Sequence, residues 1–460
     1  MDFTPLIVRQ RAFFHSGATL PLEFRRTQLR RLLGALVAHE AAVLGALQAD
    51  LGKSPQQAYA SEVGFVLSEI RHALRHLGAW MRPVRRRAPL LAWPARGFIR
   101  PEPLGVALII GPWNYPLQLL LSPLVGAIAA GNCAILKPSE FAPHTAAVLG
   151  QLLGSTFPEE FIAVVQGDQA SAAALLLQRF DSIFFTGSTP TGRAIMAAAA
   201  RHLTPVTLEL GGKCPCIVCA DAPLASTARR IVWGKFMNAG QTCVAPDHVL
   251  VEQAVAGAFL EALKQALRDF YGEDPQQSPD YGRIINRRHF DRLIGFLGDG
   301  QIAWGGRHDA ADCYLAPTLL TGVPWAAAVM QEEIFGPILP LVEFVDLDEE
   351  LAKLRGRATP LALYLFTRDA ARQQRVLAGS RSGGVCINDT VMHILGKELP
   401  FGGLGESGMG AYHGRAGFDC FTHRRAVLRC SSAFEAKVRY PPARRTLPGL
   451  KRLLRLLGAG

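Results

Sequence analysis

The sequence predicts an α/β protein with two large domains, and three observations support this class. The first is length, because 460 residues exceed what one ordinary hydrophobic core organises. The second is composition, since 49% hydrophobic and 19% charged residues are typical of a globular chain. The third is the alternation of short apolar runs with helix-like stretches, which occurs between positions 105 and 210 and starts again after 211. We therefore expect parallel sheets covered by helices on both faces.

The N-terminal part precedes the first sheet. Residues 20–80 are predicted to be helical, and residues 81–103, rich in Pro and Arg, suit an arm that leaves the body of the protein. The opening residues MDFTPLIVRQ lack the basic and apolar regions of a secretory signal, so we expect an unsecreted protein. Nine scattered cysteines, an odd number, fit a reducing compartment better than a disulfide scaffold.

Five strands and four intervening helices are predicted in the first domain. The strands are Val106–Ile110, Cys133–Leu136, Ile162–Val165, Ser182–Phe185 and Val206–Leu208. The helices are Leu117–Ala130, Ala142–Leu153, Gln169–Arg179 and Thr189–Ala200. The apolar stretch 103–136 is interrupted by prolines and by Gly131-Asn132, so a buried strand–helix–strand is favoured over a membrane span. A ligand is expected beyond the carboxyl ends of the strands.

The second α/β pattern follows residue 211. A strand at 248–252 precedes a helix at Ala256–Phe270, and a strand at Leu361–Phe366 precedes a helix at Ala370–Ala378 and the strand-like GGVCIN. Cys214, Cys216 and Cys219 suggest a metal site, but alternation along a strand would point them to two faces, and no fourth ligand lies at zinc-finger spacing. No catalytic metal is predicted.

Four of the five strand ends in the first domain carry polar or glycine-rich segments, which are GPWNYP (111–116), LKPSE (136–140), FTGSTPTG (185–192) and LELGGK (208–213). Such loops build the binding sites of α/β sheets. Gly187 and Gly192 frame a strand-to-helix turn whose free N–H groups suit a phosphate. A helix capped by Ser188 or Thr189 explains the same residues equally well, so the pattern leaves both interpretations open.

Cys243 lies in the segment KFMNAGQTCVAP (235–246), directly after a Gly-Gln-Thr run. Small residues there permit a close approach of the backbone to a ligand, and a thiol is intrinsically nucleophilic. A single cysteine taken alone is more often a buried core residue than a nucleophile.

The motifs together resemble the aldehyde dehydrogenase superfamily, and in local detail its class 3 branch, the fatty and aromatic aldehyde dehydrogenases. The motifs occur in that family's order, and they are GPWNYP, LELGGK, FMNAGQTC, EEIFGP (332–337) and the LPFGG run at 399–408. The resemblance implies an enzyme that oxidises aldehydes to carboxylic acids with NAD⁺, with NADP⁺ also accepted. The implied substrates are medium- or long-chain aliphatic or aromatic aldehydes.

The same resemblance assigns three catalytic residues. Cys243 matches the nucleophile that forms a thiohemiacetal and then a thioester. The side-chain amide of Asn114, with the backbone N–H of Cys243, matches the oxyanion donors. Glu209 matches the base that activates the hydrolytic water, a task that suits a carboxyl group of raised pKa. Lys235 resembles a family lysine near the nucleophile, and its role stays open.

Nine residues match cofactor-binding positions of the family. The adenine ribose is assigned to Lys137 and Glu140, and the pyrophosphate turn to Ser188 between Gly187 and Gly192. Glu333 and Phe335 match positions beside the nicotinamide ribose and ring, and the set is completed by Trp113 and Leu210. A carboxylate near the ribose would disfavour the extra phosphate of NADP⁺, although related enzymes often use both.

The implied architecture divides the chain into five parts. They are a Rossmann-like NAD(P)-binding domain (1–80 and 104–210), an oligomerisation arm (81–103), a catalytic domain (211–395), a return to the first domain with an oligomerisation strand (396–440, the strand near 418–430) and a basic tail (441–460). The family architecture implies a homodimer. Two alternatives are a dehydrogenase that transfers the acyl group to coenzyme A and a non-catalytic nucleotide-binding protein. The presence of Glu209 argues against the first, and the complete catalytic set argues against the second.

The tail carries much of the basic character. Of the formal net charge of +11, seven units come from residues 436–460, which hold seven Lys or Arg and no acid. No nucleic-acid-binding motif accompanies them. In the tail, Leu450, Leu453, Leu454 and Leu457 recur at helical spacing. Either this helix docks on protein, or residues 445–458 contact an anionic membrane weakly, which we favour. We expect a cytoplasmic protein, peripheral at the inner surface of the membrane.

Overall fold

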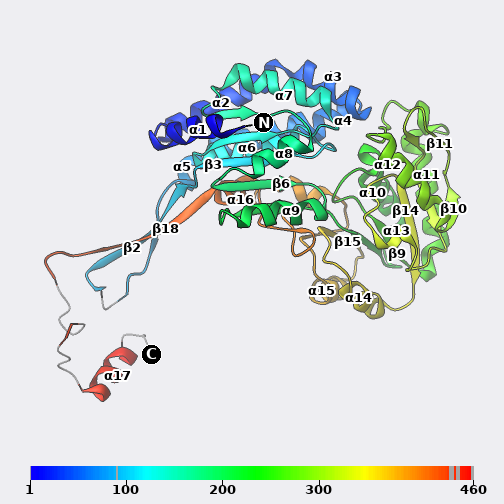
Figure 1. Cartoon of the computed structure of the whole chain (residues 1–460). Helices are drawn as coiled ribbons and strands as arrows, with labels where there is room; N and C mark the ends of the chain where they lie inside the picture. The colour runs from blue at the N-terminus through cyan, green and yellow to red at the C-terminus, as the bar shows by residue number, and fades with distance from the viewer. Residues whose placement is uncertain (1, 90–91, 435–439, 442–445, 457–460) are drawn as a thin grey trace.

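The computed structural model describes residues 2–89, 92–434, 440–441 and 446–456 (Figure 1). Helices open the chain, with bounds α1 Thr4–His15, α2 Leu22–Ala38, α3 Glu40–Leu51, α4 Pro55–Ala58 and α5 Gly64–Trp80, and a π-helical turn η1 at Tyr59–Val63. The helical region thus begins earlier than the predicted residue 20. Its first helix escapes sequence reasoning because only Ile7 and Gln10 of α1 are buried, which leaves little apolar periodicity.

The first sheet confirms all five predicted strands, with ends that differ by one residue at most. The strands are β3 Val106–Ile110, β4 Cys133–Lys137, β5 Ile162–Val164, β6 Ser182–Thr186 and β7 Val206–Glu209, and a short sixth strand, β17 Gly408–Met409, pairs antiparallel with β7. The order is β17-β7-β6-β3-β4-β5, with β3 to β7 parallel. From β3 the chain continues to β4 and β5 on one side, and it then crosses to β6 and β7 on the other side of β3. The strand order therefore changes direction between β3 and β6, which makes this a topological switch point.

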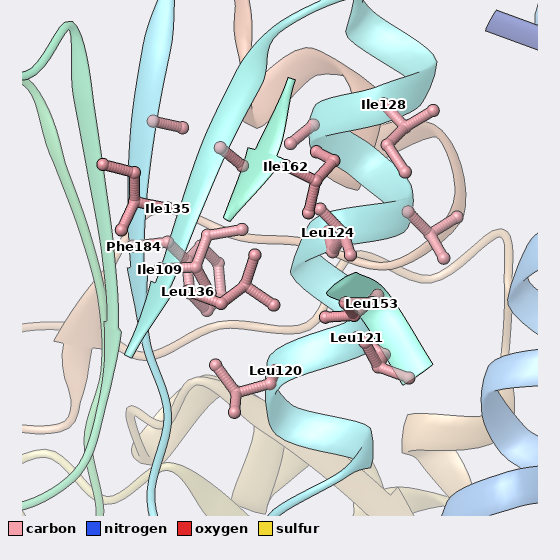
Figure 2. Close-up of a cluster of buried hydrophobic side chains, with 14 of the residues drawn as sticks. Ile109, Leu120, Leu121, Leu124, Ile128, Ile135, Leu136, Leu153, Ile162 and Phe184 are labelled. Carbon is pink, nitrogen blue, oxygen red and sulfur yellow. The ribbon is translucent and has the colours of Figure 1, made fainter. Parts of the chain in front are cut away.

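Four predicted helices pack on this sheet, with bounds α6 Gln118–Ala130, α7 Pro143–Thr156, α8 Gln169–Leu176 and α9 Thr189–Ala200. Helix α8 ends three residues before the predicted Arg179. Every residue of α6 is buried, and Figure 2 shows Leu120 and Leu124 on the side of the helix that faces the sheet, whereas Leu121 lies beside Leu153. The helix stops at Gly131, whose φ of +92° is a left-handed conformation that glycine adopts without strain.

The apolar stretch 103–136 therefore forms a strand, a core helix and a second strand, as predicted. In the described part of the chain, no single helix has the length and apolarity that a bilayer crossing requires. The helices α2 and α3 reach the required length and apolarity only when taken together, and the two are bent by 66° relative to each other.

The second sheet has seven strands in the order β10-β13-β14-β9-β8-β15-β16. Their bounds are β8 Pro215–Val218, β9 His248–Glu252, β10 Gln301–Trp304, β13 Thr318–Thr321, β14 Ile338–Phe344, β15 Ala362–Phe366 and β16 Gly384–Ile387, with only β10 antiparallel to its neighbour. A hairpin of β11 His308–Asp309 and β12 Tyr314–Leu315 lies outside this sheet. The helices are α10 Leu224–Phe236, α11 Ala256–Tyr271, α12 Arg287–Gly295, α13 Ala328–Gln331, α14 Leu347–Arg355 and α15 Ala370–Gly379.

The strands and helices predicted after residue 211 are confirmed to within one residue. The prediction for the three cysteines of this domain is confirmed as well. Cys214 and Cys216 belong to the larger hydrophobic core of the second domain, whereas Cys219 belongs to a separate core cluster with Ile217. Alternation along β8 thus separates the thiols onto two faces of the sheet.

A three-stranded antiparallel sheet extends from the body (Figure 1), and it contains β1 Val84–Arg86, β2 Ala95–Pro103 and β18 Thr422–Cys430. Strand β18 pairs with β2 along nine residues, from Thr422 opposite Pro103 to Cys430 opposite Ala95. The predicted late strand starts at 422 rather than 418, because residues Gly414–Cys420 form helix α16 against α6. The last described element is α17 Leu447–Leu456, which Figure 1 places apart from the body.

Candidate active site

Four of the predicted site segments lie at one edge of the first sheet. Because β3, β4, β6 and β7 are parallel, the residues that follow them emerge together at the carboxyl edge. Asn114 follows β3, Lys137 ends β4, Gly187 and Ser188 follow β6, and Glu209 ends β7. This edge therefore carries an amide, a lysine, a helix start and a carboxyl group.

Cys243 belongs to the second domain and lies between α10 and β9, after a 3₁₀ turn at Met237–Gly240. Three consecutive residues of this turn are left-handed, with φ of +54° at Asn238, +51° at Ala239 and +76° at Gly240. A Cβ on Gly240 would lie 2.2 Å from the carbonyl oxygen of Gly336. Non-glycine residues in this conformation store backbone strain, which concentrates at functional sites.

Two hydrogen bonds join the loop after β3 to the cysteine loop. The side-chain amide of Asn114 donates from Nδ2 to the carbonyl oxygen of Gln241 (3.0 Å). The hydroxyl groups of Tyr115 and Thr242 are hydrogen-bonded at 2.7 Å. Asn114 is thereby held beside the residues that directly precede Cys243, with one of its two amide hydrogens engaged.

Glu209 is a buried carboxyl group whose side chain is 2% exposed. Neither of its oxygens has a hydrogen-bond partner within the described residues. Burial alone raises its pKa well above the ordinary value. An unpaired carboxyl of this kind is poised to accept a proton from a neighbouring water, and it lies close enough to Cys243 to act on the charge of its thiol.

The thiol of Cys243 is held in its neutral form. Burial raises its pKa, with further increases from the negative charges of Glu333 and Glu209, whereas the backbone N–H groups of Cys243 and Val244 act in the opposite direction. Its carbonyl oxygen accepts a hydrogen bond from the thiol of Cys214 at 3.4 Å. Two carboxyl groups from different domains thus act on the charge of this sulfur.

A cavity of about 610 Å³ opens beside Cys243. Its wall is mainly apolar and is built by four distant segments of the chain, from α4 to α5, the loop after β3, helices α10 and α11, and residues 391–413. The residues that matter below are Tyr115, Trp233, Met237, Cys243, Phe270 and Met392. An apolar cavity with a thiol in its wall suits a substrate with a hydrocarbon body and one reactive end.

On the other side of the site, a second crevice of about 840 Å³ is lined by Thr189, Gly211, Gly212, Glu333 and Glu406, among other residues. Gly211 of this crevice and Gly192, in the helix that begins at Thr189, permit close packing against protein side chains. A Cβ on Gly211 would lie 2.1 Å from a carboxylate oxygen of Glu333, and one on Gly192 would lie 2.7 Å from Leu210. This cradle beside the N-terminus of α9 fits a dinucleotide, because its backbone N–H groups suit a pyrophosphate.

Ser188 caps α9, since its hydroxyl accepts a hydrogen bond from the N–H of Thr191 at 3.5 Å. The helix-cap interpretation is therefore confirmed, and the phosphate-binding interpretation stays a prediction. Thr189 donates to the carbonyl oxygen of Glu406 at 3.0 Å, which ties the turn to the segment that precedes β17.

Glu333 and Phe335 lie on a loop that a buried ion pair holds in place. Asp247 pairs with Lys213 and also accepts the N–H of Ile334 at 2.9 Å. Burial, with the charge of Asp247, raises the pKa of Glu333 to about 8. The ring of Phe335 packs edge-on against Trp113 at 5.3 Å between centroids, so two residues assigned to the nicotinamide end contact each other.

Lys137 and Glu140 lie together but away from the residues that line the cavity. The ammonium group of Lys137 is 3.3 Å from the Glu140 carboxylate and donates to the carbonyl oxygen of Pro138 at 2.8 Å. Lys235, whose role the sequence left open, is buried. Desolvation lowers its pKa to about 8, although the negative charge of Asp247 acts to raise it.

Sequence reasoning missed the polar contacts that align the two loops. Gln241 donates from Nε2 to the carbonyl oxygens of Asn238 (3.0 Å) and Arg283 (2.9 Å), which fixes the cysteine turn on the second domain. The Gly-Gln-Thr run indicated close packing but not which partner each side chain would meet. Tyr412 and His413 also line the cavity, although they lie about 170 residues after Cys243 in the sequence. No motif around them predicted this position.

Comparison with known proteins gives a consistent result. The model of the family described as "Aldehyde dehydrogenase family" matches residues 6–427. The chain is 49% identical over 440 residues to "Aldehyde dehydrogenase family 3 member A2" of Mus musculus, a match that covers 95% of this chain and 90% of the relative. It is 46% identical to "Aldehyde dehydrogenase, dimeric NADP-preferring" of Rattus norvegicus, over 96% and 98% of the two chains.

Among solved structures, the chain is similar to the one described as "Substrate bound state of Staphylococcus Aureus AldH". The two superpose with a TM-score of 0.96 and 44% sequence identity, over 99% of this chain and all of the other.

Proposed function

The chain belongs to the aldehyde dehydrogenase family and oxidises aldehydes with NAD(P)⁺, and we propose that it does so through a covalent intermediate on Cys243. The observation that carries the proposal is the meeting of three groups from two domains. The nucleophile loop places Cys243 in the wall of an apolar cavity, Asn114 is hydrogen-bonded to that loop, and Glu209 is buried and unpaired within the described residues. The experiments that test these roles open the Discussion.

In the first step the thiol of Cys243 gives up its proton to solvent, and its sulfur bonds to the aldehyde carbon as the carbonyl π bond opens to the oxyanion of a thiohemiacetal. The developing oxyanion is bound by Nδ2 of Asn114 and the backbone N–H of Cys243. Removal of one such donor typically lowers the rate by about 10²- to 10³-fold. The contact of Asn114 with Gln241 supports this role, because it aims the amide toward the loop that presents the thiol.

When bound in the crevice, a dinucleotide would accept the hydride that the thiohemiacetal loses as it becomes a thioester. Glu209 then takes a proton from water as the water attacks the thioester, and the carboxylic acid leaves Cys243. The buried, unpaired carboxyl of Glu209 supports hydrolysis over transfer to coenzyme A. Gly187, Ser188, Gly192, Leu210 and Glu333 would hold the dinucleotide, with Trp113 and Phe335 beside its nicotinamide end.

We assign the adenine ribose to Lys137 and Glu140. Glu140 would disfavour the 2′-phosphate of NADP⁺, but its ion pair with Lys137 offsets part of this negative charge. The pair therefore supports NAD⁺ as the preferred cofactor, with NADP⁺ also accepted.

The cavity predicts a preference for long or aromatic aldehydes. Each methylene group of the substrate that is transferred from water into the cavity contributes about 0.8 kcal/mol of binding free energy, or about fourfold in kcat/KM, until the cavity is filled. We expect this rise across a series of linear aldehydes, read by NADH absorbance. Trp233, a cavity-lining residue that is 40% exposed, is expected to contribute only to long substrates. Trp233→Ala should lower kcat/KM for dodecanal by roughly tenfold and leave propanal, the internal control, unchanged. A flat chain-length profile would contradict this substrate class.

We also propose a homodimer, and the name of the rat relative describes that protein as dimeric. The sheet of β1, β2 and β18 is the candidate contact element. It extends from the body, and β1 and β18 lie at its two edges, where backbone groups can pair with a strand of a second subunit.

A further proposal concerns the tail, for which we expect weak binding to anionic membranes. Helix α17 supports it, because Lys451, Arg452 and Arg455 are exposed and no acid lies between 446 and 456. Residues 445, 457 and 458 of the predicted segment lie outside the described residues, as does Leu457 of the leucine stripe.

Vesicle sedimentation should detect this binding. Full-length protein is expected to sediment with phosphatidylserine-containing vesicles more than a version that ends at Tyr440, and the difference should shrink as salt screens the lysines and arginines. Neutral vesicles are the control. Equal sedimentation of both proteins would remove the proposal.

A further inference from the structure

A fully buried ion pair lies beneath the loop that carries Asn114. Lys53 directly follows the left-handed Gly52 at the end of α3, and Glu62 lies in the π-helical turn η1. Both side chains are 0% exposed, and the ammonium nitrogen is 2.5 Å from Oε1 of Glu62. A buried ion pair is often no more stabilising than an apolar pair of the same size, so its presence needs a reason other than stability.

The Lys53–Glu62 pair is hydrogen-bonded to both ends of the segment Asn114–Gln118. Lys53 donates to the backbone carbonyl oxygen of Asn114 at 2.9 Å. The other carboxylate oxygen of Glu62 accepts the N–H groups of Leu117 (2.9 Å) and Gln118 (3.2 Å), where α6 begins. Those N–H groups have no partner within a helix, so the carboxylate caps α6 while its cation holds the start of the loop.

The three donor directions of Lys53 are all used in this arrangement. One is taken by Glu62, one by the Asn114 carbonyl, and the nitrogen lies 4.0 Å from the centroid of the Tyr115 ring. The Asn114 carbonyl also accepts from Nδ2 of Asn238 at 2.9 Å, in the strained turn before the nucleophile. Both acceptor positions of this oxygen are thereby filled, which fixes the plane of the peptide and the direction in which the side chain leaves it.

We propose that Lys53 and Glu62 are positioning residues for the oxyanion donor, an inference that rests on the function proposed above. They hold the backbone of Asn114 and Tyr115 so that the amide of Asn114 and the hydroxyl of Tyr115 meet Gln241 and Thr242. The pair touches no reacting atom, and it acts on the rate through Asn114.

The test is a neutral pair, Lys53→Met with Glu62→Gln, in which the introduced side-chain amide still offers an oxygen to the N–H groups that begin α6. Only the donor to Asn114 and the charges are lost. We expect a folded enzyme with unchanged NADH affinity and KM, and with kcat and the first-turnover rate lower by about tenfold, a fraction of the loss for a missing donor. The control is Arg11→Met with Asp181→Asn, a partly buried pair at 3.0 Å remote from the loop, which should keep the wild-type kcat.

The decisive readout is the same change made in an Asn114→Ala background. If the pair acts through Asn114, its removal there should lower kcat by less than twofold, because the two effects are not additive. An equal loss in both backgrounds, or wild-type kcat in the neutral pair, overturns the inference. Should Asn114→Ala itself have wild-type kcat, the proposed oxyanion role fails instead, and the two failures are distinct.

A second variant covers the case in which the neutral pair melts more than about 5 °C lower. Glu62→Asp keeps both charges and withdraws the carboxylate by one methylene from the start of α6. It should lower kcat with KM unchanged, and again only when Asn114 is present. A change in KM alone, or an equal loss without Asn114, overturns the inference.

Discussion

Cys243→Ala is expected to abolish NADH formation from every aldehyde, with a loss of roughly 10⁴- to 10⁶-fold in kcat. In the proposed mechanism the thiol, which lies in the wall of the cavity, forms the covalent bond with the substrate, and alanine removes it without adding bulk. The measurement is NADH absorbance in the first turnover as well as in the steady state, so that slow product release cannot hide residual chemistry.

The control for this variant is Cys313→Ala. Cys313 is half-buried like Cys243 but lies outside the residues that line the cavity, and its replacement should leave both phases unchanged. Binding of NADH to Cys243→Ala, followed by fluorescence, should remain at the wild-type level, which separates loss of chemistry from loss of the cofactor site. Activity that survives in Cys243→Ala would move the nucleophile elsewhere.

Glu209→Gln is expected to give one burst of NADH and then turn over more slowly by about 10²- to 10⁴-fold, the usual contribution of a general base. The burst survives because thioester formation does not require this carboxyl, whereas hydrolysis does. Since neither oxygen of Glu209 has a partner in the described structure, glutamine removes no hydrogen bond and should leave stability unchanged. Steady-state turnover equal to that of the wild type would remove Glu209 from the mechanism.

The pH dependence gives a second measurement of the same role. Burial raises the pKa of Glu209, and the base is active only when deprotonated, so deacylation should accelerate as pH rises through that elevated pKa. The wild-type rate is thus expected to increase with pH above the range of an ordinary glutamate. In Glu209→Gln this rise should be absent, while a rise of equal size in the variant would assign the titration to another group.

Much of the fold was predictable because its strands are continuous apolar runs between recognisable turns. Val106–Ile110 is an example, since all five residues are buried on both faces of the sheet and its ends match the prediction. The start of the chain was not predictable in the same way, because α1 buries little surface. Secondary structure was therefore predictable where a segment buries many apolar residues, and not where it buries few.

In the candidate site, too, local sequence predicted some features and not others. Asn114, Glu209 and Cys243 stand next to strand ends or glycine-rich turns, which local sequence can mark. Their alignment depends on contacts across large sequence distances, such as Tyr115 with Thr242 and Lys53 with the Asn114 carbonyl. No periodicity or spacing encodes such pairs, so only coordinates bring them together.

A sulfur that stays protonated between turnovers is also chemically quiet. Peroxides and alkylating reagents react with thiolates, so a cysteine whose ionisation is suppressed by its surroundings resists them while no substrate is bound. The suppressed ionisation therefore limits oxidation and alkylation of Cys243 to the interval in which the reaction needs its thiolate.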